Sequence, residues 1–431
     1  MLSGGWNGMS EPLEGFRVVE LTLAVQGPAA GLYLRDMGAE VLKVEPPIGD
    51  SSRHGRNKNN ETPEGTYGPQ FVAVNRGKRS LCIDLTTDLG KKAFHGLLGQ
   101  ADVLLTNYRM PALRKLGLDY ESLQERYPEL IYASVNGFGP EGPDADKAML
   151  DGAAVARGGM LSLTGKKEEL PVLLGTVVGD TGGAMQLALG VLTALLARER
   201  FGGGQKVSVS GLGAQLWFQQ WELTHESMTG ELLERDGQHH CNIRGPYGLY
   251  RTADSKAILL ANSMTLESWD AFCVFADVPE LVFHPKLQTP GGRLGEGLTE
   301  GESEEIRERL EIAFVKKTSK EWDEFLRTQP EIIWERVRNH QEVFEDEQNL
   351  VNGYFTEVNI PGLGKRTTVG NLVKLSRTPG SEKGDPPVLG EANEEVLSGI
   401  GLSQSEVTEI GTVVETAREE AVAAYEKLRE N

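Results

Sequence analysis

The chain has 431 residues, of which 39% are hydrophobic, a composition typical of an ordinary soluble enzyme with two or three domains or one large domain carrying an insertion. Its 63 acidic residues outnumber its 44 basic residues and give a formal net charge of −19. So negative a surface repels polyanions, so we expect neither nucleic acid nor an anionic membrane as a partner, and an anionic ligand needs a local basic pocket.

The cysteines and the chain's start indicate a compartment. Cys82, Cys241 and Cys273 lie far apart and form no CxxC pair, which argues against a disulfide framework and a zinc knuckle and favours the reducing cytoplasm. The pair His239-His240 lacks a third ligand at a helical or hairpin spacing, so we expect no metal site. The first residues show no signal peptide, and no run approaches the roughly 20 apolar residues that cross a bilayer.

The first predicted elements form a strand–helix–strand unit, the building block of a parallel sheet. Residues 17–22 and 40–45 are short β-rich runs that flank a helical stretch. The intervening turn reads LAVQGPAAG and lacks the GxGxxG spacing, so the dinucleotide fingerprint is missing. The polar stretch 49–70 is predicted to be a long loop, and it is locally basic through Arg53, His54, Arg56 and Lys58.

A second basic cluster follows a predicted buried strand at residues 102–107. Arg109, Arg114 and Lys115 come just after that strand's carboxyl end. In open α/β sheets this edge is where ligands bind, so three cations there indicate a candidate anion site. A solvated helix face is the alternative interpretation.

The stretch from Val177 to Glu199 is the most informative part of the chain. A short apolar lead ends at Asp180, and about four helical turns of Ala, Leu and Val follow. Asp180 occupies the expected N-cap position, so one interpretation is that it caps the helix. The other is that it is a nucleophile, held ionised by the helix amides and dipole, with Gly182 and Gly183 leaving room for a bulky ligand.

The alternating α/β pattern continues to about residue 225, and after it the sequence predicts turns, a hairpin and helices. We therefore predict an α/β fold, with a large Rossmann-like domain with a parallel sheet in residues 1–230 and a smaller α+β domain in residues 231–330. Residues 331–431 are predicted to be a linker and a C-terminal return to the large domain.

Several segments together resemble the class III coenzyme A transferase family, which includes formyl-CoA:oxalate, carnitine and bile-acid CoA-transferases and the 2-methylacyl-CoA racemases. They cover most of the chain in the family's order, and this joint order is specific although no single motif is decisive. The segments are PLEGFRVVELT, LRDMGAEVLKVEPP, NRGKRSLCIDL, ADVLLTNYRMPALRKLGLDYESL, PELIYASVNGFGPEGP, GDTGGAMQLALGVLTALLARERFGGGQKVSVS, GLYRTADS and PPVLGEANEEVL.

The resemblance implies a site and an assembly. The family's catalytic aspartate falls on Asp180. Its coenzyme A contacts fall on Val25, Gln26, Asp84, Asn107, Tyr108, Arg109, Lys115 and Asp151. The implied partners are an acyl-CoA donor and a carboxylic acid acceptor, with the CoA thioester as substrate, no permanently bound cofactor and no metal. The implied state is an interlocked homodimer.

The implied chemistry is nucleophilic catalysis by a carboxylate. Asp180 attacks the donor thioester to form a mixed anhydride, and the thiolate returns to give an aspartyl-CoA thioester. The amides of the following glycines are a hypothetical source of oxyanion donors. Racemases of the family carry His where this chain has Leu150, which disfavours racemisation. That alternative stays open, as does a non-catalytic CoA-binding protein.

Departures from the formate-type enzymes bear on the acyl group. Those enzymes carry Gln, Arg and Tyr at the positions of Val25, Pro46 and Leu150, and a run of glycines in the small domain. Oxalate is therefore not the expected acceptor. The segment GPYGLYRTAD is more similar to the carnitine and bile-acid members, and the acyl group stays open.

Overall fold

The computed structural model describes residues 11–54, 67–382 and 384–430. The chain divides into two compact units. The first unit contains residues 1–158, 176–218 and 347–431, and the second contains residues 159–175 and 219–346. The second unit therefore extends beyond the expected 231–330 span on both sides and takes in a short segment from within the expected large domain.

The first unit is built on a six-stranded parallel sheet with the order β3-β2-β1-β4-β5-β7, the arrangement of a doubly wound α/β sheet. The strands are β1 (Arg17–Leu21), β2 (Glu40–Glu45), β3 (Arg79–Cys82), β4 (Val103–Thr106), β5 (Ile131–Asn136) and β7 (Lys206–Ser210). The predicted α/β fold with a central parallel sheet is thus confirmed. The order reverses between β1 and β4, and this is where such sheets bind ligands.

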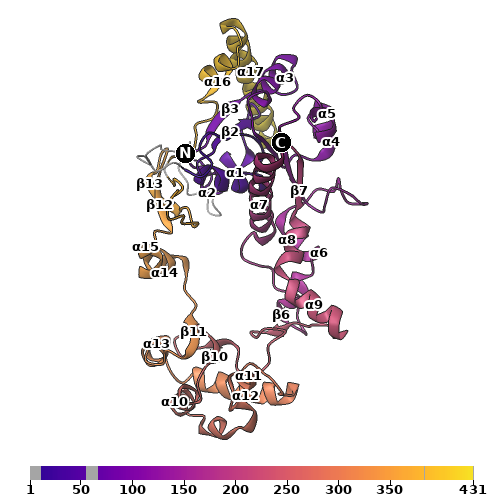
Figure 1. Ribbon diagram of the computed structural model, residues 1–431. Helices are drawn as coiled ribbons and strands as arrows, with labels where there is room; N and C mark the ends of the chain where they lie inside the picture. The colour runs from indigo at the N-terminus through magenta and orange to yellow at the C-terminus, as the bar shows by residue number, and fades with distance from the viewer. Residues whose placement is uncertain (1–10, 55–66, 383, 431) are drawn as a thin grey trace, which may run out of the picture. The chain divides into compact units, whose positions relative to one another are not determined.

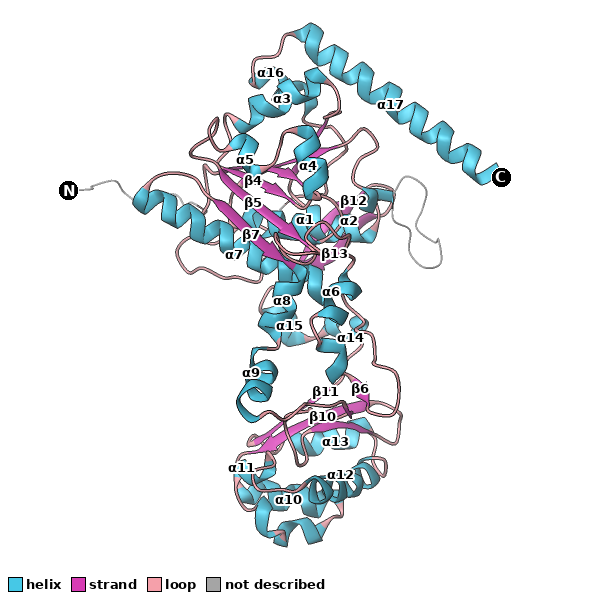
Figure 2. Cartoon of the chain, turned by 90° about the vertical axis from the view of Figure 1, so that its right-hand side faces the viewer, coloured by secondary structure: helices cyan, strands magenta, loops and turns pink. Residues whose placement is uncertain are grey.

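Helices cover both faces of this sheet, because successive strand residues point to opposite sides. One layer consists of α3 (Asp88–Leu98), α4 (Met110–Leu116), α5 (Tyr120–Leu123), α16 (Asn393–Gly399) and α17 (Gln404–Glu430). The other contains α1 (Gln26–Asp36) and α7 (Val178–Phe201). Val19 faces the first layer and Val18 the second, and both are buried. Figure 2 shows α3 and α16 together on one side of the strands.

Helix α7 is the longest element of its layer and packs on α1, β5 and β7. By length and composition it could cross a membrane, with a mean hydropathy of 1.3, so the expectation that no run approaches that length is wrong. In the fold, Leu187 and Val191 of this helix pack on the apolar residues of α1 and of the sheet. This packing accounts for the apolar residues on the inner face of the helix.

Shorter elements complete the first unit. They are the 3₁₀ turn η1 (Ser51–His54), α2 (Pro69–Asn75), α6 (Asp151–Arg157), α8 (Gly211–Phe218), α15 (Glu347–Val351) and the antiparallel hairpin of β12 (Phe355–Ile360) and β13 (Gly364–Val369). Figure 1 shows α6 and α8 near the end of α7. Both helices contact α7, and so they surround the start of the helix that carries Asp180.

The second unit has a three-stranded antiparallel sheet of order β11-β10-β9 packed on helices. Its strands are β9 (Gly248–Arg251), β10 (Ala257–Ser263) and β11 (Ile332–Arg336), with the small pair β6 (Gly165–Lys166) and β8 (Asp236–Gly237). Its helices are α9 (Gln220–Thr229), α10 (Leu266–Ala276), α11 (Pro290–Arg293), α12 (Glu300–Phe314), α13 (Ser319–Leu326) and α14 (His340–Glu345), with the 3₁₀ turns η2 (Met160–Leu163), η3 (Pro279–Phe283) and η4 (Pro285–Leu287). Capping boxes at Thr299 and Thr318 start α12 and α13.

Candidate active site

Asp180 is the third residue of α7, not its N-cap. The helix begins at Val178, and the N-cap residue Val177 offers no side-chain hydrogen bond. The capping carboxylate comes instead from the start of α6: Oδ1 of Asp151 accepts the N–H groups of Gly179 at 2.6 Å and of Asp180 at 3.1 Å. The expectation that Asp180 caps its own helix is therefore wrong.

This arrangement changes the expected electrostatics of Asp180. Its half-buried carboxylate accepts no hydrogen bond from any residue that the structure describes. Burial, and then the negative charge of Asp151, raise its pKa to about 6. The sequence predicted that the helix start holds the carboxylate ionised, yet the structure places it where ionisation is opposed. At neutral pH it is still mostly a carboxylate and a better base than an ordinary Asp.

The glycines after Asp180 make room for protein side chains. A methyl group on Gly182 would lie 2.5 Å from Cε2 of Phe218 in α8, and one on Gly183 would lie 2.3 Å from Nε2 of Gln26. The first-turn amides of Gly179 and Asp180 already donate to Asp151, and Gly182 and Gly183 lie further inside the helix. These glycines therefore do not offer free amides as oxyanion donors, and the structure corrects both earlier expectations for them.

The turn between β1 and α1 brings Val25 and Gln26 to the carboxyl edge of the sheet. Ala24 has a positive φ of 64°, which is uncommon for a residue other than glycine. Asn107, at the end of β4, holds this turn from both sides: its Oδ1 accepts the N–H of Leu23 at 2.9 Å and its Nδ2 donates to the carbonyl of Leu23 at 2.7 Å. Asn107 thus lies beside the turn that carries the predicted CoA contacts Val25 and Gln26, and its side-chain amide is hydrogen-bonded to the backbone of that turn.

A buried network of charges supports the same turn from inside the sheet. Nζ of Lys43 lies 3.0 Å from Oδ2 of Asp50 and 3.3 Å from Oε1 of Glu20, and it donates to the carbonyl of Thr22. Nζ of Lys78 lies 2.8 Å from Glu20. These charged side chains are buried, and Asp50 also accepts the N–H of Ala24 at 3.2 Å. Sequence reasoning missed this network, although charged residues inside the apolar runs RVVEL and EVLKVE were a signal.

The remaining predicted CoA contacts lie on loops and helices that follow β3 and β4. Arg109 is the exposed N-cap residue of α4 and donates to the carbonyl of Asp146, and Lys115 is exposed near the end of the same helix. Tyr108 packs against the core, and burial raises its pKa to about 12. Asp84 follows β3, and its Oδ1 accepts from the N–H and the hydroxyl of Thr86.

The predicted basic loop behaves differently. Arg53 turns inward and pairs with Glu45, with two N–O distances of 2.7 Å. Nε2 of His54 lies 2.9 Å from the carbonyl of Ile48. Arg56 and Lys58 lie outside the described residues. Of the arginines and lysines that the sequence placed near this edge, Arg109, Arg114 and Lys115 are the exposed ones in the described part of the chain.

The comparison with protein families decides what kind of protein carries this site. The model of CoA-transferase family III matches residues 13–393, nearly the whole chain. The chain belongs to CoA-transferase family III.

Relatives with CoA-transferase activity in their names match this transferase over most of its length. It is 30% identical over 408 residues to the cinnamoyl-CoA:phenyllactate CoA-transferase of Clostridium sporogenes, covering 92% of this chain and 95% of the relative. It is 32% identical over 404 residues to the succinyl-CoA:mesaconate CoA-transferase of Haloarcula hispanica, covering 92% of this chain and 98% of the relative. The expected family and the expected enzyme class are confirmed.

Solved structures show the same fold. A CAIB/BAIF family protein from Brucella suis aligns with a TM-score of 0.76 at 26% identity, covering 91% of the transferase and 100% of that chain. The protein Rv3272 from M. tuberculosis aligns with a TM-score of 0.76 at 28% identity, covering 90% of the transferase and 99% of that chain. The α/β architecture is therefore shared with this group.

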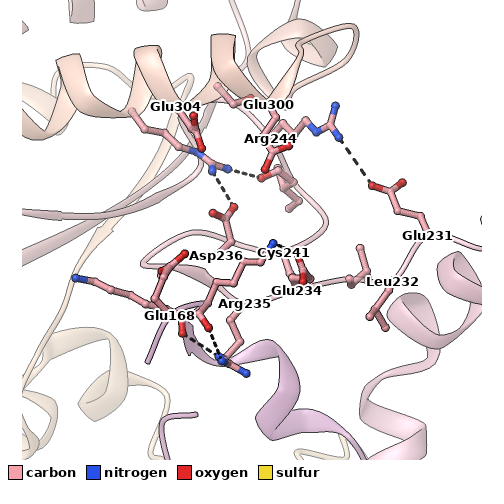
Figure 3. Close-up of a pocket in the computed structure, with 17 residues that line it drawn as sticks. Glu168, Glu231, Leu232, Glu234, Arg235, Asp236, Cys241, Arg244, Glu300 and Glu304 are labelled. Carbon is pink, nitrogen blue, oxygen red and sulfur yellow. Dashed lines mark hydrogen bonds and ion pairs between the residues drawn. The ribbon is translucent and has the colours of Figure 1, made fainter. Parts of the chain in front are cut away.

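The transferase also has a polar cavity of about 570 Å³ inside its second unit (Figure 3). Its arginines already have partners: Arg307 lies 2.7 Å from Asp236, Arg244 lies 3.9 Å from Glu231, and Arg235 donates to backbone carbonyls. None of the predicted site residues lines it. No group of three His, Cys, Asp or Glu side chains within the described ranges could hold a metal ion. The candidate site therefore stays with Asp180.

Proposed function

We propose that this CoA-transferase moves CoA from an acyl-CoA donor to a carboxylic acid acceptor, with Asp180 as the nucleophile. The carboxylate attacks the donor thioester carbonyl, and the C–S bond breaks to give a mixed anhydride and CoA thiolate. The thiolate attacks Cγ of Asp180 and releases the donor acid, which leaves an aspartyl-CoA thioester. The acceptor carboxylate then repeats the two steps in the opposite direction, restoring the free carboxylate of Asp180.

The observation that carries this proposal is the state of the Asp180 carboxylate. It lies at the junction of α1, α6, α7 and α8, and within the described chain it has no hydrogen-bond donor and no ion-pair partner. A capping or structural Asp normally has such partners, because even a half-buried carboxylate is costly without them. An unpaired carboxylate with a raised pKa in a family of CoA-transferases fits a nucleophile.

The carboxyl edge of the sheet supports CoA binding there. We place the CoA moiety against the turn of Val25 and Gln26 and along the segment that follows β4, where Arg109 and Lys115 are exposed. Guanidinium and ammonium groups bind phosphates through charge-assisted hydrogen bonds. Asp84, Asn107, Tyr108 and Asp151 act in this proposal by shaping the site, because the structure shows their polar groups or rings engaged with the protein. Their predicted direct contacts with CoA stay predictions.

A homodimer is supported by an apolar surface on the first unit. The outward face of α7 and the adjacent part of α8 expose Met185, Leu189, Leu196, Trp217 and Phe218. All of these except Leu196 line, together with β7, an apolar cavity of about 820 Å³. So large an apolar patch on one unit marks an interaction surface, and we propose that a second copy of the chain covers it.

The free cysteines of the described chain support the proposed cytoplasmic location.

The experiment that tests the function is mass spectrometry of the enzyme mixed with a panel of acyl-CoA thioesters and then digested. We expect a hydroxylamine-sensitive acyl or CoA adduct on the peptide that contains Asp180, and none in Asp180→Asn. Asp88→Asn is the matched control, because Asp88 is also an acidic residue in the first turn of a helix. An adduct elsewhere, or full CoA exchange by Asp180→Asn, contradicts the proposal.

The same samples separate transfer from racemisation. Leu150, the N-cap residue of α6, is exposed and brings no acid–base group to the position that a racemase base would occupy. Deuterium entering the α-carbon of the thioester without any acceptor acid, and with no adduct on Asp180, indicates a racemase. We expect no such exchange.

A further inference from the structure

Gln26 carries an unexplained hydrogen-bond donor. Its side chain is only 5% exposed, and Nε2 is fully buried without an acceptor among the described residues. Buried amide groups almost always find a partner, so an unpaired one requires a reason. Gln26 is the first residue of α1, and it lies at the carboxyl edge of the sheet, where the candidate site is.

The position of this donor relative to Asp180 follows from helix geometry. Nε2 of Gln26 lies 2.3 Å from where the β-carbon of a residue at Gly183 would be. Residues three apart on a helix have β-carbons roughly 5–6 Å apart on the same face. Gly183 follows Asp180 by three residues, so the unpaired amide lies on the same face of α7 as Asp180, within about one side-chain length of its β-carbon. Only a residue without a side chain at position 183 leaves the amide there.

The proposed function creates an acceptor at this place. When CoA thiolate attacks Cγ of the acylated Asp180, a C–S bond forms and the carbonyl electron pair moves onto the side-chain oxygen of Asp180. When that oxyanion collapses, the C=O bond re-forms and the donor carboxylate leaves. The same oxyanion forms again when the acceptor carboxylate attacks the aspartyl-CoA thioester and the thiolate leaves.

These oxyanions differ from those of the other two steps. In the first and last steps the negative charge develops on the carbonyl oxygen of the substrate acyl group. In the two middle steps it develops on a side-chain oxygen of Asp180, which stays on the face of α7 that Gln26 packs against. A donor for it can therefore be buried and fixed as well, which the buried Nε2 of Gln26 satisfies. The amides of Gly179 and Asp180, which already donate to Asp151, do not provide it.

We propose that Nε2 of Gln26 is the catalytic hydrogen-bond donor for the oxyanion that forms on the side chain of Asp180. This inference rests on the proposed role of Asp180 as nucleophile. It assigns to Gln26 the stabilisation of the middle steps, beyond any contact that it makes with CoA. Removing one preorganised oxyanion donor costs roughly 10²–10³-fold in rate.

The test is a rapid-mixing experiment on Gln26→Met, which keeps the length of the side chain and removes the donor. The enzyme is mixed with an acyl-CoA thioester without acceptor, quenched in acid and analysed by intact mass. In the wild type we expect the CoA adduct of the aspartyl thioester. In Gln26→Met we expect the acyl adduct of the anhydride to form at the wild-type rate and its conversion into the CoA adduct to slow by roughly 10²–10³-fold.

The controls separate this inference from the proposed function. Gln124→Met changes an exposed glutamine on the first unit and is expected to leave both steps unchanged. If the wild type forms no adduct on Asp180, the proposed function fails. If it does and Gln26→Met converts the anhydride at the wild-type rate, only the inference fails. If Gln26→Met loses its fold by circular dichroism, Gln26→Leu, which also lacks a donor, carries the same comparison, and unimpaired conversion in it overturns the inference.

Discussion

Replacing Asp151 by Asn tests the electrostatic coupling at the start of α7. The change removes one negative charge and keeps an Oδ1 that can accept the N–H groups of Gly179 and Asp180, now 2.6 and 3.1 Å away. The cap of α7 is therefore expected to survive. The pKa of Asp180, raised to about 6 by burial first and Asp151 second, is expected to fall. Burial remains in the variant, so the pKa stays above the ordinary value of 3.8.

The magnitude follows from the order of these causes. Burial is the larger cause, so Asp151 accounts for less than half of the interval between 3.8 and about 6. The expected fall is therefore about one pH unit or less, and each unit corresponds to about 1.4 kcal/mol between the two protonation states. The nucleophile is the ionised form, so activity is lost as the pH falls through the pKa of Asp180. The variant should keep its activity to a lower pH than the wild type.

The assay is the pH dependence of the first half-reaction, measured with an acyl-CoA thioester and no acceptor, so that the titration of an acceptor acid does not interfere. The acid limb of such a profile reports the pKa of the essential base. Asp119→Asn is the matched control, because Asp119 also caps a helix through its carboxylate and does not perturb Asp180. An acid limb that stays in place in Asp151→Asn, or moves to higher pH, refutes the coupling.

Three further outcomes are expected. Asp180→Asn should raise the free energy of unfolding by about 1–2 kcal/mol at pH 7 and by almost nothing at pH 4. The reason is that a carboxyl whose folded pKa is raised destabilises the fold only at a pH where it must ionise. Chemical denaturation at both pH values checks this, and equal increases in the free energy of unfolding at both contradict it. Arg109→Gln should raise KM for acyl-CoA about tenfold with a weaker salt dependence, whereas Arg126→Gln on an exposed site should not. Leu189→Lys should give a monomer in light scattering, whereas the equally exposed Ile312→Lys should leave the assembly unchanged, and a dimer in both refutes the proposed interface.

The local patterns of the chain predicted its elements well. The β-rich runs at 17–22 and 40–45 became β1 and β2, the buried strand expected at 102–107 became β4, and the hairpin expected after residue 225 became β9 and β10. Each of these depends on side-chain periodicity or on a turn within a dozen residues. Such signals are visible in the sequence, because the residues that interact are neighbours along the chain.

Several features of the candidate site could not be predicted from local sequence patterns. Asp180 matched the composition of an N-cap, yet Asp151, from a different helix, caps α7. Lys43, Asp50 and Lys78 were passed over, because their partners come from other strands and loops and the burial of a charge is decided by tertiary contacts. The resemblance to a known family selected Asp180 as the candidate nucleophile, and this assignment stays a prediction. Its environment, and hence its raised pKa, could be known only from the fold.

The buried charges under the β1–α1 turn also restrict how this protein can change. Glu20, Lys43, Asp50 and Lys78 alternate in sign, and each touches at least one member of opposite charge. Loss of Glu20 leaves Lys78 without an ion-pair partner in the interior, and loss of Lys43 leaves Asp50 without one, at a cost of about 3–5 kcal/mol. Substitutions at these positions are therefore tolerated only together, so the turn that carries Val25 and Gln26 resists change by single mutations. Exposed residues of the same unit outside the proposed site, such as Gln124, leave no buried charge unpaired and can vary one at a time.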